Sequence, residues 1–299
     1  MEQIKSIVAT TDFSDTSDSA VERAAIVAKS LGAKCTITNV ISRGTLNALH
    51  DLMSPDSSDE LEHTLLDDAL DKLHKLAEGL RANHGVDASV SVSAGSVLRQ
   101  IAQQVENQGA GLIVMGAHGS GFVRDLLIGS TTDRVLRKTA RPMLVVRKKP
   151  VGEYQRVLVP VDFSERSGAA IALAHAVAPN AELVLMHAYQ VPYEGHLRMA
   201  GVAEAKMAEL RQSAKDEAAR QLQEFVSSIG VPDTTTRPLL VQGQAASAIV
   251  EQAKKLDCDL IAIGKQGLRM IEELVLGSVT RQVLEQAPCD VLVADRKRH

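Results

Sequence analysis

The chain has 299 residues, of which 45% are hydrophobic and 23% charged, and these values are typical of a globular protein large enough for two domains. Aromatic residues make up only 2% and the formal net charge is −4, so a protein that stacks nucleic-acid bases on aromatic side chains is disfavoured and no nucleic-acid partner is expected. Since no apolar run approaches the ~18 residues of a membrane span, no membrane partner is expected either.

Apolar runs alternate with helical patterns along the first half of the chain. Strands are predicted at residues 4–9, 35–41, 86–92, 112–115 and 143–147. Helices are predicted from the Ser14–Asp15 cap to Gly32 and at residues 60–81, 95–106 and 130–138. The polar, turn-rich stretch 42–59 is predicted to be a surface loop. This alternation indicates an α/β fold with a parallel sheet.

The second half of the chain repeats the first. Asp12 and Asp162 both stand in the tripeptide Asp-Phe-Ser and lie 150 residues apart, whereas Gly116 and Gly264 lie 148 residues apart. A deletion of two residues near Pro179–Asn180 accounts for the difference. The repeat predicts two tandem domains, at residues 1–149 and 154–299, joined by the polar segment 148–153.

A glycine-bearing loop follows the fourth predicted strand in each half. The pattern Gly-x2-Gly-x9-Gly-Ser occurs at 116–130 and again at 264–278, and one occurrence is expected by chance in roughly one such chain per hundred. Glycines allow a close approach of the backbone to a ligand, and the following helix N-terminus favours an anion. The pattern therefore favours a phosphate site over its simpler alternative, two ordinary strand-to-helix turns.

Three predicted strands end near this loop, at Asp12, Val40 and Gly116, so their carboxyl ends could share one pocket. The equivalent residues of the second half are Asp162, Ala188 and Gly264. An aspartate at this place is suited to ribose hydroxyls or a magnesium ion, and its alternative role is to cap the first helix.

Motifs of known enzyme chemistry are missing from the sequence. It contains no GxxxxGK[ST] loop, no GxSxG elbow, no CxxC and no HExxH pair, so no catalytic or metal-ligating residue is assigned. His118 lies in the first glycine loop, but Gln266 replaces it in the second. The cysteines Cys35, Cys258 and Cys289 have no metal or redox spacing and are expected to be buried free thiols, in keeping with a cytoplasmic location.

Both halves resemble universal stress protein domains over essentially their whole length, and the glycine pattern resembles the ATP-binding signature of that family. The resemblance implies a tandem protein whose domains each have a five-stranded parallel sheet with helices on both faces. It implies that ATP or AMP binds, with Mg²⁺ as a candidate companion. The residues that match the family's nucleotide site are Asp12, Val40, Gly116, Gly119, Gly129, Ser130 and Thr131, and in the second half Asp162, Ala188, Gly264, Gly267, Gly277 and Ser278.

The two copies depart from the family pattern in different ways. The first half has Thr10 where members often have proline, and the second has Val279 in place of the Thr131 hydroxyl. The second loop also carries Glu272–Glu273, which repel phosphate, although Lys265 and Arg269 oppose that repulsion. On these grounds the first site is expected to bind more tightly.

The sequence is thus interpreted as that of a stress-response sensor or regulator that binds adenine nucleotide and acts on a protein partner it does not identify. A nucleotide-free interaction scaffold and, less favoured, an ATP-hydrolysing or adenylyl-transferring enzyme remain alternatives. Family dimers pair through the last strand, so the resemblance implies an internal pseudo-dimer through 143–147 and 290–294, and a further homodimer stays open.

Overall fold

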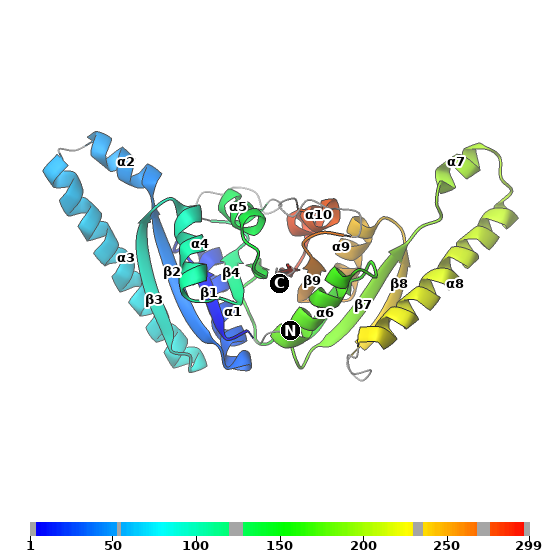
Figure 1. Cartoon of the computed structure of the whole chain (residues 1–299), viewed down its shortest axis with the longest axis horizontal. Coiled ribbons are helices and arrows are strands. Elements are labelled where there is room, and N and C mark those ends of the chain that lie inside the picture. Colours follow the sequence, from blue (N-terminus) through cyan, green and yellow to red (C-terminus); the bar gives the residue numbers. More distant parts are fainter. Residues whose placement is uncertain (1–3, 53–54, 120–127, 230–235, 268–275, 296–299) are drawn as a thin grey trace. The chain divides into compact units, whose positions relative to one another are not determined.

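The structure, a computed structural model, describes residues 4–52, 55–119, 128–229, 236–267 and 276–295. The chain divides into two compact units, the first ending at Glu153 and the second spanning Tyr154–Asp295. Each unit contains strands and helices of its own (Figure 1).

The first unit is built on five parallel strands in the order β3-β2-β1-β4-β5. Their bounds are β1 Ser6–Thr10, β2 Lys34–Ser42, β3 Ala88–Gly95, β4 Leu112–Gly116 and β5 Met143–Val146. The helices are α1 Asp15–Leu31, α2 Arg43–Leu52, α3 Pro55–His84, α4 Val97–Asn107 and α5 Ser130–Lys138. Helix α1 contacts α3 and α4 contacts α5, which gives a helical layer on each face of the sheet.

The second unit repeats this architecture, in the order β10-β9-β6-β7-β8, with all four strand pairs parallel. Its strands are β6 Arg156–Pro160, β7 Glu182–Tyr189, β8 Thr236–Gln242, β9 Leu260–Gly264 and β10 Asp290–Ala294. Its helices are α6 Glu165–Val177, α7 Glu194–Met199, α8 Glu204–Ile229, α9 Ala245–Lys255 and α10 Ser278–Gln286. The predicted fold class, two tandem domains with five-stranded parallel sheets, is confirmed.

The core of the first unit lies between the central strands and α1. Every residue of β1, β4 and β5 is buried, as expected of parallel strands covered on both faces. Helix α1 buries mainly alanine and valine, and its bounds follow from its caps. Ser14 accepts a hydrogen bond from the Ser17 backbone N–H, and Gly32 ends the helix at φ 61°.

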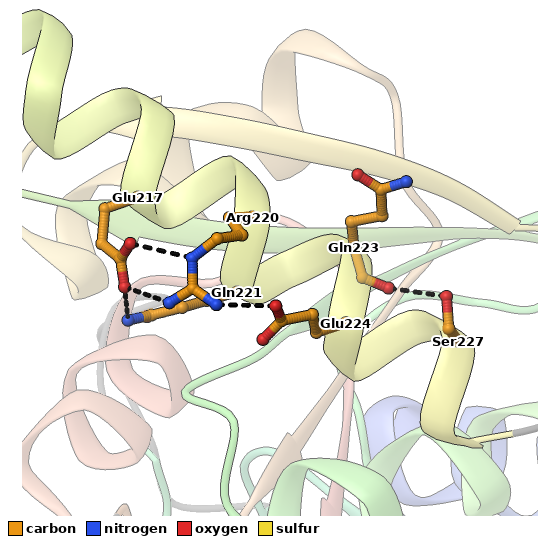
Figure 2. A network of polar contacts seen from close by, with 6 residues as sticks. All are labelled: Glu217, Arg220, Gln221, Gln223, Glu224 and Ser227. Atoms are coloured by element: carbon orange, nitrogen blue, oxygen red, sulfur yellow. Dashed lines mark hydrogen bonds and ion pairs between the residues drawn. The ribbon is translucent and has the colours of Figure 1, made fainter.

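Helix α8 is polar along its exposed side, where side chains form a hydrogen-bonded network (Figure 2). Arg220 donates to Glu217 and, one turn further on, to Glu224. Gln221 donates to the same Glu217, and Ser227 donates to the backbone carbonyl of Gln223. Because these pairs are spaced three or four residues apart, they support the helix itself, while Met207, Ala218 and Leu222 attach it to its unit.

The predicted surface loop at residues 42–59 is wrong. Helix α2 occupies 43–52, and α3 begins at Pro55 instead of residue 60. Leucines at 46, 49 and 52 recur at helical spacing, and proline is favoured at the first position of a helix. The residues 56–59, two of the serines and two of the aspartates that suggested a loop, are therefore part of the start of α3.

The third strand also differs from its prediction. It runs from Ala88 to Gly95, not from 86 to 92, and Gly95, expected to open the next helix, is the last residue of the strand at φ 133°. Helix α4 begins at Val97, after Ser96. Because β3 is an edge strand with mostly half-buried residues, its hydrophobic pattern marks its ends poorly.

Candidate functional site

A cavity of about 690 Å³ opens at the carboxyl ends of β1, β2 and β4 in the first unit. In the strand order, β1 and β4 are the neighbours at which the chain reverses direction across the sheet, and ligands of open α/β sheets collect at such a point. All seven residues predicted for the first half line this cavity: Asp12, Val40, Gly116, Gly119, Gly129, Ser130 and Thr131.

The second unit has an equivalent cavity of about 510 Å³. Its lining contains all six residues predicted for the second half: Asp162, Ala188, Gly264, Gly267, Gly277 and Ser278. The repeat in the sequence therefore places two sets of matching residues around two matching cavities.

The glycines of the first cavity lie in close contact with other parts of the chain. A Cβ on Gly116 would lie 3.1 Å from the carbonyl oxygen of Thr16, and one on Gly129 would lie 3.2 Å from that of Ala117. A Cβ on Gly119 would lie 2.5 Å from Oδ2 of Asp12. Side chains at these positions would fill the space between the end of β4 and the start of α5, which we call the glycine cradle. This explains why glycine stands at each of the three positions.

Hydrogen bonds fix the two sides of this cradle to each other. The N–H of Gly129 donates to the Ala117 carbonyl at 2.7 Å, and Oγ1 of Thr132 donates to the Gly116 carbonyl at 2.9 Å. In the second unit the N–H of Gly277 donates to Lys265 at 3.0 Å, and Oγ1 of Thr280 donates to Gly264 at 2.8 Å. The framework is thus the same in both units.

Helices α5 and α10 each begin at the mouth of their cavity. Their N-cap residues are Gly129 and Gly277, which provide no side-chain cap. Ser130 and Ser278 follow as the first residues of these helices, and both are exposed. A helix that begins without a side-chain cap presents its first N–H groups and its positive dipole end to an anion.

The Asp-Phe-Ser turn holds the aspartate at the opposite wall. Phe13 and Phe163 both adopt φ 63°, which is uncommon for a residue other than glycine. Oδ1 of Asp12 accepts hydrogen bonds from the N–H and Oγ of Ser14, at 3.2 Å and 2.6 Å. The turn therefore fixes the carboxylate beside Gly119, and Ser14 rather than Asp12 caps α1.

The described lining of the first cavity is acidic. It includes Asp12 and Asp68 and, within the described residues, neither lysine nor arginine. Close by, burial raises the pKa of Asp18, and the negative charges of Asp15 and Asp12 add to that rise against the hydrogen bond from Thr11. A polyanionic ligand here depends on backbone N–H groups, hydroxyls or a cation of its own. Groups of three or more metal-ligating side chains were not found in the described part of the chain.

Lys265 of the second loop has an ion-pair partner that the sequence analysis did not identify. Its side chain is buried and its Nζ lies 2.7 Å from Oδ2 of Asp295, so its charge is paired away from the cavity. The expectation that Lys265 opposes the repulsion between phosphate and the two glutamates stays a prediction. Glu272, Glu273 and Arg269 lie outside the described residues.

Several lining residues were missed by the sequence analysis. Helix α3 contributes Leu65, Asp68 and Ala69, which lie within the predicted helix but were not expected at the cavity. Strand β2 contributes Thr38 and Asn39 beside the predicted Val40. Thr38 lies two residues before Val40 and therefore on the same face of the strand, which is the signal that could have found it.

All three cysteines are buried free thiols, as predicted. Burial raises the pKa of Cys35 to about 11, and burial is also the main cause that raises the pKa of Cys258 to about 11. Nothing in the described part of the chain is a helix of the length and apolarity that a bilayer requires.

Comparison with known proteins assigns both halves of the chain to the same family. The family model described as the universal stress protein family matches residues 3–147 and again residues 153–295. A universal stress protein of Thermus aquaticus, described as lying in the QAH/OAS sulfhydrylase 3′ region, is 34% identical over 142 residues, which are 47% of this chain and 98% of the relative.

Two further members of this family are similar to the chain. Universal stress protein A homolog 1 of Coxiella burnetii is 32% identical over 144 residues, which are 46% of this chain and 94% of the relative. The crystal structure of a universal stress protein from Archaeoglobus fulgidus covers 99% of this chain and 100% of its own, with a TM-score of 0.70 and 22% identity. That likeness shows the shared fold. The chain belongs to the universal stress protein family and carries two domains of that family in tandem.

Proposed function

We propose that this protein binds adenine nucleotide, ATP or AMP, and acts as a cytoplasmic sensor or regulator in a stress response. One observation carries the proposal: every residue of both predicted signatures lines one of two equivalent cavities. Their volumes, about 690 and 510 Å³, fall within the range of small-molecule sites, ~300–1,000 Å³.

The positions of the lining residues support one orientation of the nucleotide in the first cavity. The phosphates would lie at the N-terminus of α5, where Gly129 leaves the first N–H groups without a side-chain cap. The ribose would lie against Asp12, because a carboxylate accepts hydrogen bonds from hydroxyls. The base would lie over β2, beside Val40, two strands away from β4.

Mg²⁺ fits the same arrangement. The described lining offers two carboxylates and neither lysine nor arginine, so the phosphates of ATP would be neutralised by a metal ion that arrives with them. Asp12 and Asp68 are the residues that would face this ion.

Titration calorimetry with ATP and Mg²⁺ tests the proposal. The full chain should bind ATP, and the variant that carries both Gly119→Val and Gly267→Val should not, since both valines project toward the aspartate carboxylates. Equal binding by the two proteins would place any nucleotide elsewhere. Absence of binding by the wild type at millimolar ATP would favour an interaction scaffold without nucleotide.

A further inference from the structure

Three hydroxyl side chains lie next to one another on the sheet of the first unit. The parallel registers pair Thr10 with Thr38 and Thr38 with Ser91, so the three side chains point to the same face. Ser91 accepts a hydrogen bond from Gln104 of α4 at 2.9 Å, which identifies this as the face that α4 covers. Thr10 and Thr38 line the cavity.

Thr38 is the unusual member of this group. Its side chain is 0% exposed, yet its Oγ1 has no hydrogen-bond partner within the described residues. A buried hydroxyl without a partner lowers stability, and such groups in folded proteins are normally paired. Thr38 is among the residues that line the cavity, so a bound ligand provides the missing partner once it displaces the atoms that cover Oγ1.

The second unit lacks hydroxyls at the three equivalent places. Its registers pair Pro160 with Met186 and Met186 with Leu239. The glycine cradles and the hydrogen bonds of Thr132 and Thr280 are nevertheless alike in the two units. The two cavities are therefore alike where phosphates would bind. They differ in the side chains that β2 and β7 contribute.

We propose that Thr38 anchors the base in the first cavity, where its hydroxyl hydrogen-bonds the polar edge of the purine. This inference rests on the proposed function. Thr38 lies on β2, separated by β1 from β4 and from the helix that would hold the phosphates, so its partner is the base and not a phosphate oxygen.

The same argument makes the second cavity less selective. Met186 offers a flexible apolar contact to either face of a ring and no hydrogen bond to its edge. A site that is built to hydrogen-bond a group rejects analogues without it far more strongly than an apolar site does. We therefore expect the first cavity to discriminate more strongly than the second between ATP and a triphosphate whose base has no hydrogen-bonding group at that edge.

Thr38→Val tests this assignment, measured by calorimetry with ATP and Mg²⁺ in a full chain that also carries Gly267→Val, so that only the first cavity binds. Valine keeps the shape of threonine and removes the hydroxyl. We expect ATP affinity to fall by about tenfold, as for loss of one buried hydrogen bond. Thr38→Ser, which keeps a hydroxyl, should retain most of the affinity.

Thr36→Val is the matched control, because Thr36 is buried on the same face of the same strand but does not line the cavity. It should leave ATP affinity within twofold of the parent. In the reciprocal background, with Gly119→Val, the change Met186→Thr should increase the affinity of the second cavity for ATP.

A second measurement separates a binding role from a structural one. Without nucleotide, Thr38→Val should unfold in urea at the same or a higher concentration than its parent, because the hydroxyl it removes has no described partner. Lower stability, or ATP affinity within twofold of the parent, would overturn the assignment of Thr38 alone. A Gly267→Val parent that binds no ATP would overturn the proposed function of the first cavity, and this inference with it.

Discussion

Gly119 lies directly against Asp12: a Cβ on the glycine would come within 2.5 Å of the carboxylate oxygen Oδ2. The two residues are 107 positions apart and belong to the loop after β4 and to the turn after β1. In the second unit a Cβ on Gly267 would lie 3.1 Å from Oδ2 of Asp162. The glycine and the carboxylate therefore form one wall of each cavity.

Gly119→Val should close the first cavity without unfolding its unit. Gly119 is exposed and none of its hypothetical Cβ contacts is with backbone, so the fold can accept a side chain there while the cavity mouth is filled. ATP affinity at the first site should fall at least tenfold, by ~1.4 kcal/mol or more. Calorimetry measures the loss, and a urea-unfolding midpoint equal to that of the wild type excludes misfolding as its cause.

Thr132 should be important for stability as well as for binding. It is buried and its hydroxyl holds the Gly116 carbonyl at 2.9 Å. Thr132→Val leaves that carbonyl without this donor and should lower the free energy of unfolding by ~1–2 kcal/mol, measured by urea denaturation. Thr132→Ser keeps the donor and is the control. A loss in Thr132→Ser together with no loss in Thr132→Val would mean that the methyl group, not the hydrogen bond, is what matters.

Removal of Mg²⁺ should weaken ATP binding more than AMP binding. The described lining of the first cavity holds Asp12 and Asp68 and neither lysine nor arginine, so a triphosphate without its metal ion meets like charge. Titrations in excess EDTA and in excess Mg²⁺ provide the comparison. ATP affinity that is unchanged by EDTA would show that residues outside the described lining neutralise the phosphates.

Stability should fall as the pH rises between about 9 and 11. Burial raises the pKa of Cys35 and of Cys258 from 9.0 to about 11, so the folded chain keeps two protons that the unfolded chain has already released. Because the unfolded state then binds fewer protons, the free energy of unfolding decreases with pH in this window and not below it. Urea denaturation at pH 8 and pH 10 measures the decrease, which Cys35→Ala should reduce.

Much of this molecule could be predicted from its sequence, for reasons that individual residues show. Buried parallel strands such as Leu112–Gly116 give continuous apolar runs, and caps such as Ser14 and Gly32 mark helix ends. Because the sequence repeats with a period of 148 residues, an element predicted in one half was supported by its equivalent in the other. The predicted site residues were found together because the carboxyl ends of parallel strands share one edge of a sheet.

The errors arose where local composition competes with tertiary packing. Residues 42–59 contain the glycine, proline and serines of a loop, yet α2 contacts both α3 and β2, and those contacts favour helix. The sequence also does not show that Oδ2 of Asp295 lies 2.7 Å from Nζ of Lys265. Thr38 looked like any strand residue until the structure showed its hydroxyl buried at the cavity.

Native mass spectrometry of the purified full chain, followed by release and identification of any bound small molecule, tests the central claim most directly. We predict adenine nucleotide on the wild type, a smaller amount on Gly119→Val, and none on the variant that combines Gly119→Val with Gly267→Val. A chain that carries no nucleotide and takes up none from millimolar ATP with Mg²⁺, or a double variant that retains as much as the wild type, would contradict the account.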